Sequence, residues 1–225
     1  MSGSSEGQTL IPKRRAWVIA VTGASGSIYA IRLIQELIKL QYPIHLLITD
    51  AGWRVIFEEL NWNMEQRNAL FLEKVGDASQ QFVKLHSIKD IGASIASGSN
   101  RTAGMVVVPC SMGTLANIAS GSSRNLLERT ADVMLKENRP LILLPRETPL
   151  HAIHLENMLK LARLGVAIVP AMPAFYHQPK SMNDLIDFVV GKLLDRMGVD
   201  HQLFERWGSE HDQPIIEEPY SDRTN

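Results

Sequence analysis

Residues 17–29 read Trp17-Val-Ile-Ala-Val-Thr-Gly-Ala-Ser-Gly-Ser-Ile-Tyr29, an apolar run that passes into a turn of small residues and then into a helical pattern. This order predicts a strand, a loop and a helix start. Backbone N–H groups are unpaired at a helix N-terminus, and the positive end of the helix dipole lies there, so an anion can bind. We therefore expect a phosphorylated cofactor or substrate at this loop, although a tight turn that needs small residues would show the same pattern. The loop residues are Gly23, Ala24, Ser25 and Gly26.

Two nucleotide-binding motifs can be compared with this loop. A Walker A motif requires Lys directly after its last Gly, and no Lys follows Gly26. The dinucleotide motif G-x-G-x-x-G requires its second Gly one position earlier than Gly26 and a third Gly where Ile28 stands. The loop therefore predicts neither an ATP site nor a standard NAD site.

Length and composition indicate one globular domain with short tails. The chain has 225 residues, of which 45% are hydrophobic and 21% charged, enough for one sizeable core. Polar and charged residues dominate 1–14 and 208–225, so we expect tails there and a single domain over 15–207. The net charge of −1 gives no overall field to attract nucleic acid, so we expect no nucleic-acid partner.

The sequence also bears on where the protein works. Cys110 is the single cysteine, which excludes an internal disulfide and fits a reducing compartment; at the end of an apolar run it reads as a core residue. No apolar run approaches the roughly 20 residues that a membrane span needs. The first 13 residues lack the apolar centre of a signal peptide. We expect a cytoplasmic protein with no membrane span.

Apolar runs alternate with helical spacing along the chain. Alternation of this kind predicts an α/β fold, a single Rossmann-like (flavodoxin-like) doubly wound parallel sheet with flanking helices. Ligands of such sheets bind at the carboxyl ends of the strands, where the connecting loops share one edge. The expected strands are 17–21, 44–49, 105–108, 141–144 and 166–169, with a weaker one at 82–88, and helical spacing occurs at 31–40, 126–134, 155–162 and 185–193.

The expected strand ends carry further small or charged residues. Ser111-Met-Gly-Thr114 forms a second small, hydroxyl-rich loop, and Arg146 follows another strand. Two such loops and an arginine on one edge indicate an extended phosphorylated ligand.

At this point the chain resembles the flavin prenyltransferases, the UbiX-type members of the homo-oligomeric flavin-containing decarboxylase-like superfamily. The matches run in order over about residues 15–207. They are Thr22-Gly-Ala-Ser-Gly26, Val108-Pro-Cys-Ser-Met-Gly-Thr-Leu115, Asn125-Leu-Leu-Glu-Arg129, Ala131-Asp-Val-Met-Leu-Lys136, Pro145-Arg-Glu-Thr-Pro149 and Pro170-Ala-Met-Pro-Ala-Phe-Tyr-His-Gln-Pro179.

The resemblance implies two ligands. Many family members carry Arg where this chain has Lys192, and Lys keeps the charge but loses the bidentate fork. The family also places an aromatic residue such as Trp207 over a pocket, although Trp207 could equally anchor the C-terminal segment. FMN is implied at Gly23, Ala24, Ser25, Thr49, Ser111, Met112, Gly113, Thr114 and Arg146, and dimethylallyl monophosphate at Ser25, Arg129, Lys136, Glu147, Tyr176 and Lys192.

The implied reaction joins the dimethylallyl group to N5 and C6 of reduced FMN and gives prenylated FMN for a partner decarboxylase, as in ubiquinone biosynthesis or aromatic acid decarboxylation. The flavin is the nucleophile, so the protein must orient the substrates and help phosphate leave. The residues implied in that role are Ser25, Arg129, Lys136 and Glu147. Enzymes that act on a prenyl diphosphate usually rely on a metal ion instead. The sequence has no D-D-x-x-D cluster to bind one, which predicts a metal-free site. The family further implies a homododecamer with sites between subunits.

The sequence leaves three other functional interpretations open. The motif Tyr176-His-Gln-Pro-Lys180 spells the Y-x-x-x-K of short-chain dehydrogenases, but that pair needs a helix and Pro179 makes one improbable. A decarboxylase of the phosphopantothenoylcysteine type would carry P-x-M-N-x-x-M-W, and Pro173-Ala-Phe-Tyr176 stands in its place. A flavin-binding scaffold without catalysis is the third.

Overall fold

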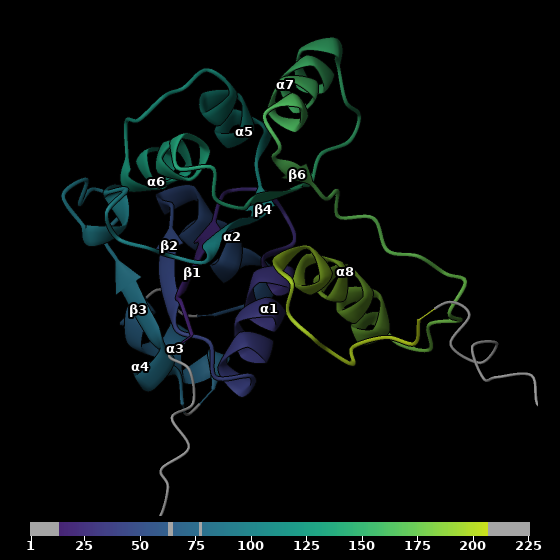
Figure 1. Cartoon of the computed structure of the whole chain (residues 1–225). Coiled ribbons are helices and arrows are strands. Elements are labelled where there is room, and N and C mark those ends of the chain that lie inside the picture. Colours follow the sequence, from purple (N-terminus) through teal and green to yellow (C-terminus); the bar gives the residue numbers. More distant parts are fainter. Residues whose placement is uncertain (1–13, 63–64, 77, 207–225) are drawn as a thin grey trace, which may run out of the picture.

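The computed structural model describes residues 14–62, 65–76 and 78–206. Six strands form one sheet in the order β3-β2-β1-β4-β5-β6, and every neighbouring pair is parallel. Helices cover the sheet on both sides (Figure 1). The predicted fold class is confirmed. The strands are β1 (Trp17–Val21), β2 (Ile44–Ile48), β3 (Val83–His86), β4 (Gly104–Cys110), β5 (Leu141–Pro145) and β6 (Ala167–Ile168).

Two apolar cores lie on opposite faces of the sheet. One contains side chains of α1, α2, α3 and α8, and the other contains side chains of α5, α6 and the short turn η1. The helices are α1 (Ser27–Lys39), α2 (Asp50–Leu60), α3 (Arg67–Val75), α4 (Ser79–Phe82), η1 (Ser94–Ala96), α5 (Met112–Ala119), α6 (Leu126–Lys136), α7 (Ala152–Arg163) and α8 (Met182–Met197).

The central strands explain why the sequence pattern was so clear. All residues of β1 are buried, with Ile19 and Val21 in one core and Val18 and Ala20 in the other. A strand covered on both faces reads as an unbroken apolar run. The predicted bounds of 17–21 are therefore confirmed.

Elsewhere the predicted bounds shift by a few residues. β4 runs on to Cys110 past a register shift, whereas β6 shrinks to Ala167–Ile168. The segment after β6 forms a turn in which the Gln178 N–H donates to the Phe175 carbonyl at 3.0 Å, and no helix joins Tyr176 to Lys180. The dehydrogenase arrangement is therefore absent from this described segment.

The strand order also determines where a ligand can enter. From β1 the chain moves outward through β2 and β3, and then crosses back to β4 on the other side of β1. The connections after β1 and β4 therefore leave in opposite directions, which opens a crevice at the carboxyl ends of these two strands.

The remaining predictions on chain organisation fall largely outside the described residues. Of the expected tails, 1–14 and 208–225, only Arg14 is described, and Trp207 is outside as well. Among the helices of the described part, none is both long enough and apolar enough to span a membrane.

Candidate active site

Thr22 ties the two predicted ligand loops together. Its side chain is buried, and its hydroxyl donates to the Pro109 carbonyl at 2.7 Å and accepts from the Ser111 N–H at 2.8 Å. The first loop follows β1 and the second follows β4, so this hydroxyl bridges the crevice between the two strands. These hydrogen bonds hold the two loops side by side.

The first loop packs closely against α2. A Cβ added to Gly23 would lie 2.6 Å from the Ala51 Cβ, so this glycine is required by the start of α2. Gly26 has φ of 105°, a left-handed conformation that suits glycine, and it precedes α1 as the N-cap. Thr49 caps α2, because its side chain accepts from the Gly52 N–H at 2.9 Å. Thr49 is therefore a helix cap as well as a predicted flavin contact.

Glu59 occupies the helix N-terminus at which the sequence predicts an anion. Its carboxylate accepts from the Gly26 N–H at 2.9 Å, from the Ser27 N–H at 2.8 Å and from the Ser27 hydroxyl at 2.7 Å. Burial alone would raise the pKa of this carboxyl, but hydrogen bonds from Ser25, Ser27 and Gly26 outweigh burial, so the pKa lies below its ordinary value. A phosphate at the start of α1 would have to displace an ionised carboxylate.

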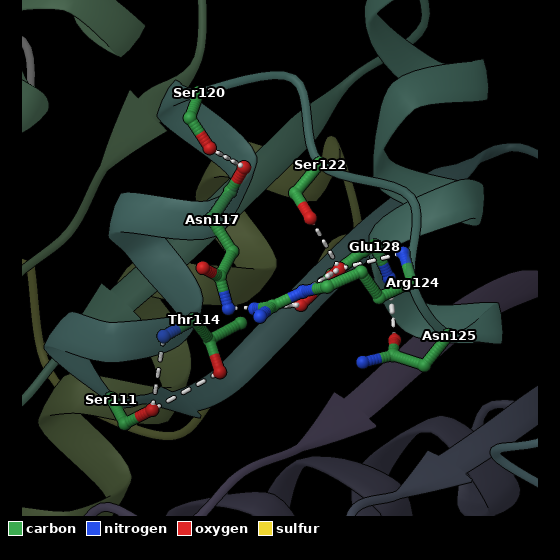
Figure 2. Close-up of polar contacts among 8 residues, drawn as sticks. All are labelled: Ser111, Thr114, Asn117, Ser120, Ser122, Arg124, Asn125 and Glu128. Atoms are coloured by element: carbon green, nitrogen blue, oxygen red, sulfur yellow. Dashed lines mark hydrogen bonds and ion pairs between the residues drawn. The ribbon is translucent and has the colours of Figure 1, made fainter.

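The second loop combines hydroxyl groups with open space. Ser111 caps α5, accepting from the Thr114 N–H at 3.3 Å, and its hydroxyl lies 3.1 Å from the Thr114 hydroxyl (Figure 2). Met112 is buried in the core below. A Cβ added to Gly113 would meet no protein atom within 4 Å, so the fold itself does not require glycine there. A ligand that lies close to this backbone would explain the glycine, because a larger side chain would occupy the same space.

Glu128 fastens the chain between α5 and α6. The side chain is 3% exposed and accepts from Asn117 Nδ2, from the Ser122 hydroxyl and from the Arg124 N–H, each at 2.9 Å (Figure 2). Burial would raise the pKa of Glu128, yet the bonds from Arg124 and Ser122 lower it below the ordinary value. This cluster fixes the start of α6, on which Arg129 lies.

Arg146 spans the two loops. Its Nε donates to the Ser25 carbonyl at 3.2 Å, and its backbone N–H donates to the Cys110 carbonyl at 3.4 Å. Among the described residues the guanidinium has no other hydrogen-bond partner, so its terminal nitrogens remain for a ligand. Glu147 is exposed, and its carboxylate accepts from the Thr148 N–H at 3.0 Å.

Among the described residues, neither Arg129 nor Lys136 makes a hydrogen bond or ion pair with these loops. Both lie on α6 and pair with carboxylates of the same segment, Arg129 with Asp132 at 2.9 Å and Lys136 with Glu137 at 3.1 Å. Lys136 ends α6 just before β5 begins, and the neighbouring Arg139 bonds carbonyls that precede β4. Lys136 therefore lies toward the amino ends of the strands, away from the ligand edge of its own sheet.

Tyr176 and Lys192 come together on the α8 side. The Tyr176 ring is 5.8 Å from the Phe188 ring at an interplanar angle of 85°, and the Lys192 ammonium lies 5.5 Å from the same ring. Lys192 also lies 3.9 Å from an Asp195 carboxylate oxygen. These two predicted substrate contacts share one aromatic neighbour.

Sequence reasoning missed Glu59. Its role depends on α2 lying along the first loop, with Ala51 near Gly23 at one end and Glu59 near Gly26 at the other. No motif surrounds Glu59, so only a helical assignment of 50–60 could have suggested it.

Neither a cysteine nucleophile nor a cluster of metal ligands is found among the described residues of this site. The Cys110 thiol is fully buried, and burial raises its pKa to about 12, which makes it inert as a nucleophile, as predicted. The described residues contain no group of three or more His, Cys, Asp or Glu side chains that could hold a metal ion.

Comparison with known proteins shows the family of the chain. Residues 4–194 match the Flavoprotein family. A flavin prenyltransferase UbiX from Halalkalibacterium halodurans is 56% identical over 196 residues, which cover 87% of this chain and 95% of that protein. A UbiX crystal structure in complex with FMN and dimethylallyl pyrophosphate is 44% identical, with a TM-score of 0.78 over 86% of this chain and 97% of the other.

A third relative bears on assembly. The dodecameric FMN-dependent UbiX-like decarboxylase from Escherichia coli O157:H7 is 41% identical, with a TM-score of 0.76 over 85% of this chain and 98% of that chain. The three relatives cover 85–87% of this chain. The chain therefore belongs to the flavoprotein family and, within it, to the flavin prenyltransferases of the UbiX type.

Proposed function

We propose that this protein transfers the dimethylallyl group of dimethylallyl monophosphate to N5 and C6 of reduced FMN, and so makes prenylated FMN. The observation that carries the proposal is the pair of loops joined by the Thr22 hydroxyl and spanned by Arg146, in a chain 56% identical to a flavin prenyltransferase. The alternatives are not favoured, because the dehydrogenase pair lacks its helix and the relatives are prenyltransferases.

The loops fit a flavin nucleotide. Ser111 and Thr114 offer hydroxyl groups, Gly113 leaves open space, and Arg146 keeps nitrogens for a phosphate or ring oxygen. When bound, reduced FMN supplies the nucleophilic nitrogen and carbon of the reaction. We propose that it contacts Gly23, Ala24, Ser25, Thr49, Ser111, Met112, Gly113, Thr114 and Arg146.

Ser25 and Glu59 form the proton-handling pair of the first loop. The Ser25 hydroxyl is hydrogen-bonded to the Glu59 carboxylate, which is itself fixed by Gly26 and Ser27. This arrangement orients the Ser25 oxygen and provides an ionised carboxylate that can take up a proton through it.

Glu147 is the proposed acid for the leaving group. Its carboxyl is exposed and lies directly after Arg146 in the chain. A protonated Glu147 can donate to the departing phosphate oxygen, a contribution typically of about 10² to 10⁴ in rate. Tyr176 and Lys192 would hold the phosphate from the α8 side.

We propose that a second copy of the chain completes the site. Arg129 and Lys136 belong to the predicted substrate set, yet in their own chain each pairs with a nearby carboxylate, and Lys136 lies toward the amino ends of the strands. Helix α7 also presents apolar side chains to solvent, with Ile153 63% and Leu155 53% exposed. A homo-oligomer, dodecameric by analogy with the Escherichia coli relative, would cover α7 and bring cations from neighbouring chains to the leaving group.

The product and location follow as part of the same proposal. Prenylated FMN would be handed to a decarboxylase that uses it, and a buried single cysteine is compatible with the reducing cytoplasm. The deciding experiment is anaerobic incubation with reduced FMN and dimethylallyl monophosphate, followed by mass spectrometry. We expect a flavin enlarged by one five-carbon unit, and an unchanged flavin mass would overturn the proposal.

A further inference from the structure

We propose that Phe188 is a positioning residue that sets Tyr176 and Lys192 relative to one another, and thereby tunes binding of the dimethylallyl phosphate; this rests on the proposed function. Phe188 lies on α8, one helical turn before Lys192, and its side chain is 6% exposed. Residues four apart on a helix lie on the same face, so the Lys192 side chain can lie over the Phe188 ring.

The ring contacts the chain segment that carries Tyr176. It lies edge-on to Tyr176 at 5.8 Å and stacks on His177 at 5.3 Å with an interplanar angle of 8°. Three prolines, Pro170, Pro173 and Pro179, keep residues 170–179 out of regular structure, and Figure 1 shows this segment crossing in an extended path from β6 to α8. The ring contacts of Tyr176 and His177 with Phe188 therefore help to hold this segment against α8.

The same ring helps to hold the ammonium of Lys192. The Nζ atom lies 5.5 Å from the Phe188 centroid and 5.1 Å from the Phe204 centroid, and these two rings are 5.1 Å apart. A cation over aromatic faces is attracted by their quadrupoles, so the two rings restrict a side chain that would otherwise be mobile. This restriction compensates in part for the bidentate fork that Lys lacks.

Helix α8, which carries Phe188, is tied to α1 beside it. Asp187, the residue before Phe188, forms an ion pair with Arg32 of α1 at 2.6 Å, and Arg32 also bonds Glu36 at 3.0 Å. Helix α1 begins at Ser27, directly after the loop that contains Ser25. The helix that carries Phe188 and Lys192 is therefore held against the helix that follows the first loop.

The test compares Phe188→Leu with Phe71→Leu, which removes a fully buried ring of the same core cluster at α3. Calorimetry would measure dissociation constants of dimethylallyl monophosphate on the FMN complex and of FMN on the apoprotein. We expect Phe188→Leu to weaken dimethylallyl monophosphate roughly 10-fold, from the lost edge-to-face and cation–π contacts, with FMN affinity unchanged. Prenylation should show the same rise in KM with a smaller change in kcat, whereas Phe71→Leu should change neither ligand affinity.

A double-mutant cycle with Lys192→Met separates positioning from general damage. If Phe188 acts in part through the ammonium, its effect should shrink when Lys192 is already removed. Fully multiplicative effects, or a Phe188→Leu loss no larger than that of Phe71→Leu, would overturn the proposal. Should Phe188→Leu fail to fold, Phe204→Leu removes one ring under Lys192 and should weaken dimethylallyl monophosphate about threefold; unchanged affinity would overturn it. Wild-type protein that binds dimethylallyl monophosphate but leaves FMN unmodified would refute the proposed function alone.

Discussion

Replacing Glu59 by Gln tests whether a side-chain carboxylate caps α1 from another helix. Helix α1 has no side-chain cap of its own at Gly26, and Glu59 provides three acceptor contacts instead. A hydrogen bond to a charged group contributes about 1.5–3 kcal/mol, and a charge at a helix terminus about 0.3–1 kcal/mol. Because the site is partly exposed, the lower end applies, and we expect Glu59→Gln to lower the free energy of unfolding by roughly 2 kcal/mol at pH 7.

The pH dependence gives the sign of the effect. The pKa of Glu59 is lowered in the folded state, so its stabilisation is present above the unfolded pKa and is lost as pH falls through the folded pKa. With an unfolded pKa of about 4.3, the gap between wild type and Glu59→Gln should be constant above about pH 5 and close below about pH 4.

Urea titration at a fixed protein concentration would measure both variants across this range. Glu58→Gln is the matched control, since Glu58 is the adjacent residue and, among the described residues, pairs with the exposed Arg54 at 2.8 Å. A fully exposed pair of this kind contributes little to stability, because water and salt screen it. The capping argument fails if Glu59→Gln costs no more than Glu58→Gln, or if the gap between wild type and Glu59→Gln persists unchanged at pH 3.

Three further outcomes are expected. Thr22→Val should lower the free energy of unfolding by roughly 1–3 kcal/mol, because the part-buried Ser111 N–H loses its acceptor, while the Pro109 carbonyl keeps the backbone N–H of residue 22 at 3.3 Å. The same change should weaken FMN binding measured by fluorescence quenching, and unchanged FMN affinity would show that the bridge is not needed. Prenyl transfer should survive EDTA, and restoration by Mg²⁺ of activity lost to EDTA would contradict a metal-free site. Glu147→Gln should retain FMN while turnover falls by about 10² to 10⁴; wild-type turnover would refute the acid role, and loss of FMN would make the residue structural.

The sequence was most informative where burial is symmetric or turns are short. β1 lies in the centre of the sheet and is covered on both faces, so its five apolar residues marked its bounds. The loop glycines were equally visible, since Gly26 takes a left-handed φ and Gly23 is pressed against Ala51. Burial of a central strand and the need for glycine in a tight loop each affect neighbouring residues in the sequence, so a short sequence pattern can predict them.

What the sequence could not reveal depends on contacts distant along the chain. Glu59 is more than 30 residues from the N–H groups that it caps, with |i−j| of 33 and 32. Helix α2 offered no strong signal, because its apolar residues are interrupted by Gly52 and charged side chains. Arg129 and Lys136 matched a family motif, yet the sequence did not show that they pair with Asp132 and Glu137.

Each of the predicted phosphate-binding cations forms an ion pair with a nearby carboxylate. Arg129, Lys136 and Lys192 are paired with Asp132, Glu137 and Asp195 at 2.9, 3.1 and 3.9 Å. Each carboxylate holds its cation in place before a ligand arrives. Partly exposed pairs of this kind are worth only about 0–1 kcal/mol, so exchanging a carboxylate for a phosphate costs little. The two loops proposed to bind FMN are instead held by the buried Thr22 bridge and by helix caps. In the proposed site, therefore, buried hydrogen bonds would support the flavin, whereas partly exposed cations with exchangeable partners would meet the phosphate.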